Sequence, residues 1–89
     1  MKHKTQEELQ KEVSNALGKV KVGELYVHYK HPDKYYVVEF VGVLENFEEV
    51  CVGYRALYGK GILWVRTLKD FMAKVEVEGK RVKRFSYVK

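Results

Sequence analysis

The spacing of apolar residues changes at Gly23, and this change constrains the fold of the 89-residue chain more than any other feature. Before Gly23 the apolar residues recur at intervals of three or four, as on one face of a helix. After Gly23 they alternate with polar residues, as in a β-strand. We therefore expect a single domain over residues 1–89, with an N-terminal helix at 5–17 and a β domain at 24–88.

The expected helix has recognisable ends. Thr5 and Glu8 have the spacing of a capping box, and Gly18 is a natural stop. Its apolar stripe consists of Leu9, Val13, Ala16 and Leu17. A stripe this narrow favours docking on the helix's own domain.

Five or six short strands are expected after the helix. They are residues 24–30, 35–44, 50–58, 62–66, 74–78 and 81–88. Residues 31–34, "HPDK", are expected to form a turn, and residues 67–72 a single helical turn. Residues 35–44 are apolar on both faces except for Glu39, which indicates a central strand.

These strands predict a mainly β (α+β) fold. One possibility is a small, SH3-like, partly closed barrel whose edge or open end is covered by the helix. The other is a twisted antiparallel sheet with the helix packed on one face.

Composition and charge exclude several classes of protein. No apolar run approaches the roughly 20 residues that span a bilayer, and the charged start does not resemble a signal peptide, so we expect a cytoplasmic protein without membrane association. Cys51 is the single cysteine, and His28, His31 and Asp33 lack metal-site spacing, so neither a metal nor a cofactor is predicted. The net charge of +5 comes mainly from residues 73–89, which carry +4 and could contact nucleic acid.

The motif Gly59-Lys60-Gly61 does not match a phosphate-binding loop. Such a loop places Lys and then Ser or Thr at the start of a helix, whereas here Gly61 is followed by a β-type run. The glycines instead fit a hairpin turn, where they permit positive φ.

With a three-residue turn at 59–61, the hairpin pairs Ala56 with Trp64 and Tyr54 with Arg66. One face then carries Tyr54, Ala56, Tyr58, Ile62, Trp64 and Arg66, and the other carries Cys51, Leu57, Leu63 and Val65, with Arg55 toward the sheet end. The second face is expected to be core. The first is either a second core layer or a recognition surface, in which Arg66 lies over Tyr54 as a cation–π pair.

His28 lies between Tyr26 and Lys30 on the polar face of its strand. It is either a general acid or base or a partly exposed strand histidine with one hydrogen bond. Cys51 is expected to be a buried, unreactive thiol.

The segments "YVHYKHPDKYYVV" (26–38), "YRALYGKGILWVR" (54–66) and "LKDF" (68–71) resemble the family of short bacterial proteins called domain of unknown function 1653. Thr67 stands where the family pattern usually has Pro. The resemblance implies a compact, mostly β domain and no assigned activity. It also implies a shared signature of Tyr26, His28, Lys30, Tyr36, Tyr54, Tyr58, Trp64 and Arg66.

These eight residues are the predicted binding site. Stacking side chains beside a cation suit a nucleic acid or a nucleotide-like ligand, so a small binding module is the leading interpretation. Two alternatives stay open. One is a protein-interaction adaptor that binds a peptide or partner domain, and the other is a small enzyme that uses His28.

Overall fold

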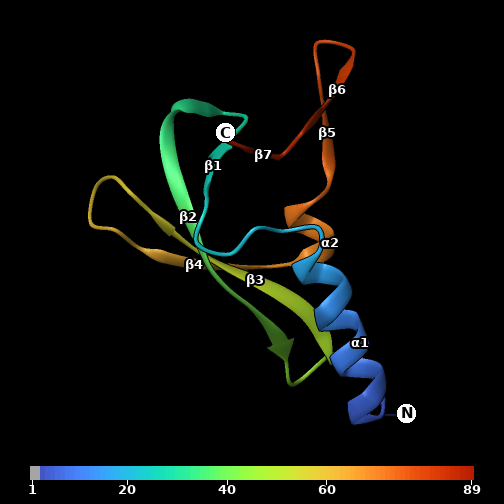
Figure 1. The fold of residues 1–89 in the computed structure, drawn as a ribbon. Coiled ribbons are helices and arrows are strands. Elements are labelled where there is room, and N and C mark those ends of the chain that lie inside the picture. The colour runs from blue at the N-terminus through green and yellow to red at the C-terminus, as the bar shows by residue number, and fades with distance from the viewer. Residues whose placement is uncertain (1–2) are drawn as a thin grey trace.

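The computed structural model describes residues 3–89 as two helices and seven strands (Figure 1). In chain order they are α1 (Gln6–Leu17), β1 (Leu25–His28), β2 (His31–Leu44), β3 (Glu49–Ala56), β4 (Leu63–Thr67), α2 (Leu68–Phe71), β5 (Lys74–Val77), β6 (Lys80–Lys83) and β7 (Phe85–Tyr87). Five strands form one antiparallel sheet in the order β4-β3-β2-β1-β7. The remaining two, β5 and β6, pair only with each other.

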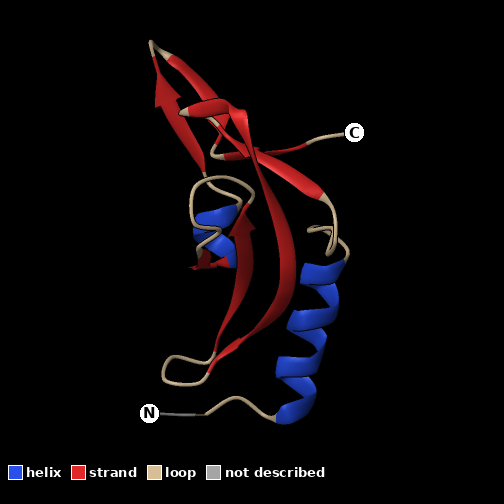
Figure 2. Ribbon diagram, turned by 90° about the vertical axis from the view of Figure 1, so that its left-hand side faces the viewer, coloured by secondary structure: helices blue, strands red, loops and turns tan. Residues whose placement is uncertain are grey.

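The prediction of a twisted antiparallel sheet with an N-terminal helix is confirmed, whereas the barrel alternative is wrong. The five strands end in two edges, β4 and β7, which do not pair to close the sheet. Figure 2 shows the long strand β2 curving along its length. The central position expected for residues 35–44 is confirmed, because β2 is the middle strand.

The helix α1 begins and ends where its sequence predicts. The Thr5 hydroxyl accepts a hydrogen bond from the Glu8 amide, the Glu8 carboxylate accepts one from the Thr5 amide, and Gly18 caps the C-terminus. Figure 1 shows α1 beside the β2–β3 hairpin, against which its buried Ala16 lies. Neither described helix is long and apolar enough to cross a membrane.

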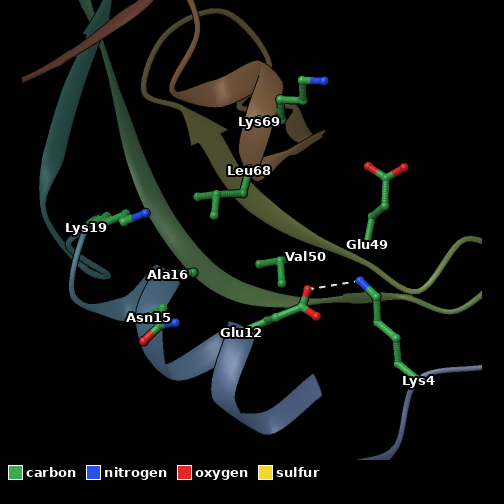
Figure 3. Close-up of a pocket in the computed structure, with 9 residues that line it drawn as sticks. All are labelled: Lys4, Glu12, Asn15, Ala16, Lys19, Glu49, Val50, Leu68 and Lys69. Atoms are coloured by element: carbon green, nitrogen blue, oxygen red, sulfur yellow. Dashed lines mark hydrogen bonds and ion pairs between the residues drawn. The ribbon is translucent and has the colours of Figure 1, made fainter. Parts of the chain in front are cut away.

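The inner face of the sheet, defined by Val50, Val52, Tyr54 and Ala56 of β3, carries the core. Figure 3 shows Ala16 of α1 and Leu68 of α2 beside Val50 around a pocket of about 320 Å³. The core cluster contains Val20, Tyr26, Tyr36, Val38, Val52, Tyr54, Ala56, Phe71 and Phe85. Both helices and β7 therefore supply residues that cover this one face.

Residues 31–34 are not a turn, contrary to the sequence prediction. The chain turns at residues 29–30, and β2 already begins at His31. Pro32 is tolerated because it lies at the start of β2, next to an irregularity in the β1–β2 pairing at Val27 and His28.

The β3–β4 hairpin pairs two residues away from the predicted register. Tyr54 lies opposite Trp64, and Val52 lies opposite Arg66. The connection is residues 57–62 rather than 59–61, although Gly59 and Gly61 have the expected positive φ. Because the shift is an even number of residues, each side chain stays on its predicted face.

The other face of the hairpin is not core, which corrects the second expectation. Cys51 is buried, but Leu57, Leu63 and Val65 are 52%, 39% and 53% exposed. This outer face, defined by Arg55, Leu63 and Val65 with Phe40 of β2, has neither helix packed on it among residues 3–89. The elements that could cover a face all pack on the inner one.

Candidate binding site

A pocket of about 250 Å³ opens on the inner face, where β1, β2, β3 and β4 approach Phe85 of β7. We call it the aromatic pocket, and its lining consists of His28, His31, Tyr36, Tyr54, Tyr58, Trp64, Arg66 and Phe85. Six of the eight residues predicted from the sequence are among them. The structure thus brings together side chains from four different predicted strands.

Tyr26 and Lys30 are the two predicted site residues that lie elsewhere. Tyr26 is buried on the other side of Phe85, where its hydroxyl accepts a hydrogen bond from the Lys21 amide at 2.9 Å. Lys30 lies exposed in the β1–β2 turn, with its Nζ 5.9 Å from the centre of the Tyr29 ring. Sharing a strand face with His28 was therefore not enough to place either residue in the pocket.

Phe85 and His31 line the aromatic pocket but were missed from the sequence. His31 was expected in a turn, yet it begins β2 and pairs with His28. Phe85 was expected only in a final strand or tail, yet β7 pairs with β1 and places Phe85 opposite His28. The alternation of Phe85 and Tyr87 was the signal that could have marked two aromatics on one face of a strand.

Phe85 forms the floor around which the other rings are arranged. It stacks on Phe71 of α2 with a centroid distance of 4.4 Å and an interplanar angle of 8°. Tyr54 and His28 meet Phe85 edge-on at 5.0 Å and 4.9 Å. Because edge-to-face and stacked contacts fix the relative orientation of the rings, they hold the floor in place without a ligand.

Arg66 is held at the pocket wall by a hydrogen bond and not by the predicted stacking on Tyr54. Its Nε donates to the Tyr54 hydroxyl at 2.9 Å, and its guanidinium lies 5.8 Å from the centre of the Phe85 ring. Asp70, four residues along, lies 3.8 Å from Nη1 and is mostly exposed, so this ion pair contributes little. The guanidinium retains donors for another acceptor because it carries five N–H groups.

The surroundings of two pocket tyrosines, Tyr36 and Tyr54, favour their protonated hydroxyls. Tyr36 and Tyr58 share a hydrogen bond, and burial together with this bond raises the pKa of Tyr36 to about 12. Burial also raises the pKa of Tyr54, although Arg66 opposes the shift. Tyr54 accepts from Arg66, and one hydroxyl of the Tyr36–Tyr58 pair must accept from the other, so each of these two arrangements leaves one O–H able to donate.

His28 is held neutral. Burial lowers the pKa of His28 below its ordinary value of 6.5, and the positive charges of Arg66 and Arg84 lower it further. Its Nδ1 accepts a hydrogen bond from the Lys30 amide at 3.2 Å, so the neutral ring carries its proton on Nε2. His28 thereby becomes a neutral N–H donor at physiological pH.

The polar groups that line the aromatic pocket are therefore neutral or positively charged. Its polar groups are tyrosine hydroxyls, histidine rings, the Trp64 indole N–H and the Arg66 guanidinium, while none of the lining residues identified within 3–89 is Asp or Glu. Trp64 is 50% exposed, so its ring is accessible to a ligand.

Within residues 3–89, no cluster of three or more His, Cys, Asp or Glu could hold a metal ion. Cys51 is buried elsewhere, and burial raises the pKa of its thiol.

Comparison with known proteins gives a family and a solved structure. The sequence profile of the family described as "Protein of unknown function (DUF1653)" matches residues 24–87. The crystal structure of a DUF1653 protein from Bordetella bronchiseptica is similar, with a TM-score of 0.68 and 26% sequence identity over 81% of this chain and 91% of that one. A search of curated proteins gives no match.

Proposed function

The chain belongs to the DUF1653 family, and we propose that its aromatic pocket binds the base and phosphate of a nucleotide-like ligand. The observation that carries the proposal is the position of Trp64 and Arg66, which line one pocket together while both remain accessible. Both residues fall within the region that matches the family, whereas α1 does not.

The size and walls of the pocket favour a flat group. Ligand pockets for drug-sized molecules occupy about 300–1,000 Å³, so a pocket of about 250 Å³ suits one ring system with a small substituent. The half-exposed Trp64 offers a face on which a base can stack, a contact that contributes about 1–3 kcal/mol per base.

The donors around this ring select an acceptor-rich partner. Arg66, His28, Tyr54 and the Tyr36–Tyr58 pair line the same pocket, and each retains an N–H or O–H donor. A phosphate and the carbonyl or ring-nitrogen acceptors of a base match such a set, and a guanidinium forms strong charge-assisted bonds to phosphate. A cationic ligand would meet like charge and few acceptors.

The test compares two arginines on opposite faces of one hairpin. Trp64 is the only tryptophan, so its fluorescence reports on the pocket during titration with mononucleotides carrying each base. Arg66→Gln is expected to weaken binding about tenfold or more, as the loss of a charge-assisted hydrogen bond implies. Arg55→Gln, which removes the same charge from the outer face where Arg55 pairs with Glu39, is expected to leave binding unchanged.

Absence of any Trp64 response to mononucleotides would refute the proposed function. An equal loss in the Arg55 and Arg66 variants would also refute it, because the effect would then reflect net charge rather than the pocket. Near-ultraviolet circular dichroism of both variants verifies that the aromatic packing is retained.

A further inference from the structure

The basic C-terminal segment forms a projecting two-stranded ribbon. Strands β5 and β6 pair through Lys74–Lys83, Val75–Val82, Glu76–Arg81 and Val77–Lys80, and the turn has positive φ at Glu78 and Gly79. Figures 1 and 2 both show this ribbon extending beyond the five-stranded sheet, from the same end of the molecule as the β1–β2 turn. A projecting paired ribbon is suited to contact a partner rather than to fill the core.

Charge is unbalanced at the base of the ribbon. Toward its tip Glu76 faces Arg81, whereas at its base Lys74 faces Lys83 directly. Like charges opposite each other destabilise a strand pair unless an anion lies nearby. None of the ion pairs among residues 3–89 involves Lys74, Lys83 or Arg84.

Arg84 connects this cationic base to the aromatic pocket. It lies between β6 and Phe85, and its amide donates to the Ala73 carbonyl at 2.9 Å. Its Nε is buried without a hydrogen-bond partner in the described part of the chain. Arg84 as a whole is only partly buried, so its positive charge can attract an anion outside the protein even though Nε itself is inaccessible. Its charge also reaches His28, whose pKa it helps to lower.

We infer that the partner is single-stranded nucleic acid, with one base in the aromatic pocket. Its phosphate backbone runs past Arg66 and Arg84 to Lys83, which lies with Tyr26 on the other side of Phe85, and to Lys74. This inference rests on the proposed function and names the polymer to which the nucleotide belongs. The pocket admits a base only if it is unstacked, which favours a single strand over a duplex. A four-residue ribbon is roughly 13 Å long, enough to follow about two phosphates.

The experiment measures binding of a mononucleotide and of an eight-nucleotide oligo-dT or oligo-U by the full chain, at two salt concentrations. The ribbon variant is Lys74→Gln/Lys83→Gln, and the control is Lys11→Gln/Lys69→Gln, which removes the same charge from exposed positions on the helices. Trp64 fluorescence follows the pocket, and anisotropy of end-labelled oligonucleotide follows the polymer.

We expect the octanucleotide to bind at least tenfold tighter than the mononucleotide. The ribbon variant should lose about tenfold in octanucleotide affinity and keep its mononucleotide affinity. Its salt dependence should fall by about 1.4 in log–log slope, because each lost phosphate contact to a single strand contributes about 0.7. Its melting temperature should stay equal or rise, since a like-charge pair is removed. If oligo-dT binds more tightly than oligo-U, the partner is DNA. If oligo-U binds more tightly, the partner is RNA.

An octanucleotide that binds no tighter than the mononucleotide, or a ribbon variant that behaves like the control, overturns this inference and leaves the pocket proposal intact. Equal affinity for an eight-base-pair duplex overturns the single-strand assignment. Equal affinity for an eight-residue poly-Glu peptide assigns the ribbon to an acidic protein instead. Failure of the mononucleotide itself to bind overturns both the pocket proposal and this inference.

Discussion

The two faces of the β3–β4 hairpin contrast in a way that their residue types do not suggest. The inner face carries tyrosines, Trp64 and Arg66, yet Tyr54 is only 4% exposed. The outer face carries the aliphatic side chains Leu63 and Val65, yet Val65 is 53% exposed. The more polar face is therefore the one that carries the buried core around Tyr54, although Trp64 at its rim is 50% exposed.

The contrast shows that coverage, and not polarity alone, determines which face of a small sheet becomes core. Aromatic rings on the inner face are long enough to meet Phe71 and Phe85 across the curved sheet, and their hydroxyls find partners in Arg66 and in one another. Burying a tyrosine is inexpensive when its hydroxyl is hydrogen-bonded. The same arrangement leaves an accessible pocket at the rim of the core.

The largest effect is expected from a comparison of Phe85→Ala on the inner face with Val65→Ala on the outer face. Phe85→Ala should lower the free energy of unfolding by about 3–5 kcal/mol, because it empties the centre of the ring cluster. Val65→Ala should cost less than about 1 kcal/mol on the exposed face. Urea denaturation measures both. Comparable costs would mean that the outer face is covered in solution, and the contrast would fail.

Gly53→Ala tests the close approach of Phe40 to the backbone on the outer face. A Cβ at Gly53 would collide with the ring of Phe40, which lies opposite it across the strand pair. We expect a loss of about 1–3 kcal/mol as the ring is displaced. In a Phe40→Ala background the same substitution should cost much less, and a double-mutant cycle measures the difference. An equal cost in both backgrounds would show that the backbone, and not Phe40, restricts this position.

The smallest expected effect is a dependence on pH. Because the folded state lowers the pKa of His28 from 6.5, the unfolded chain takes up this proton first as the pH falls. The contribution of His28 to stability is thus complete above pH 6.5, declines below it, and levels off below the folded pKa. Melting temperatures at pH 5.5 and 7.5 should differ less in His28→Gln than in the wild-type protein. An unchanged difference would show that the imidazole is not held neutral in the pocket.

Local patterns in the sequence predicted several features that do not depend on the rest of the fold. The capping box of Thr5 and Glu8 predicted the start of α1, and the two-sided apolar pattern of residues 35–44 predicted the central strand. The two faces of the hairpin also survived an error in register, because an even shift leaves each side chain on its own face.

Features that depend on distant segments could not be predicted in the same way. His31 was assigned to a turn because Pro32 and Asp33 favour one locally, and only the pairing of β1 with β2 extends the strand. Phe85 completes the aromatic pocket from β7, which is far along the chain from β3 and β4. The residues around Phe85 do not indicate which strand β7 pairs with.

Periodicity and capping act over a few residues, so they were enough to predict the helix, most of the strands and the division of the hairpin into an aromatic face and an aliphatic face. Packing between distant elements sets which face is covered and separates Tyr26 and Lys30 from the other predicted residues. It also places Arg84 between the ribbon and Phe85. Alternation along a strand creates its two faces, whereas burial depends on which distant elements pack against one of them.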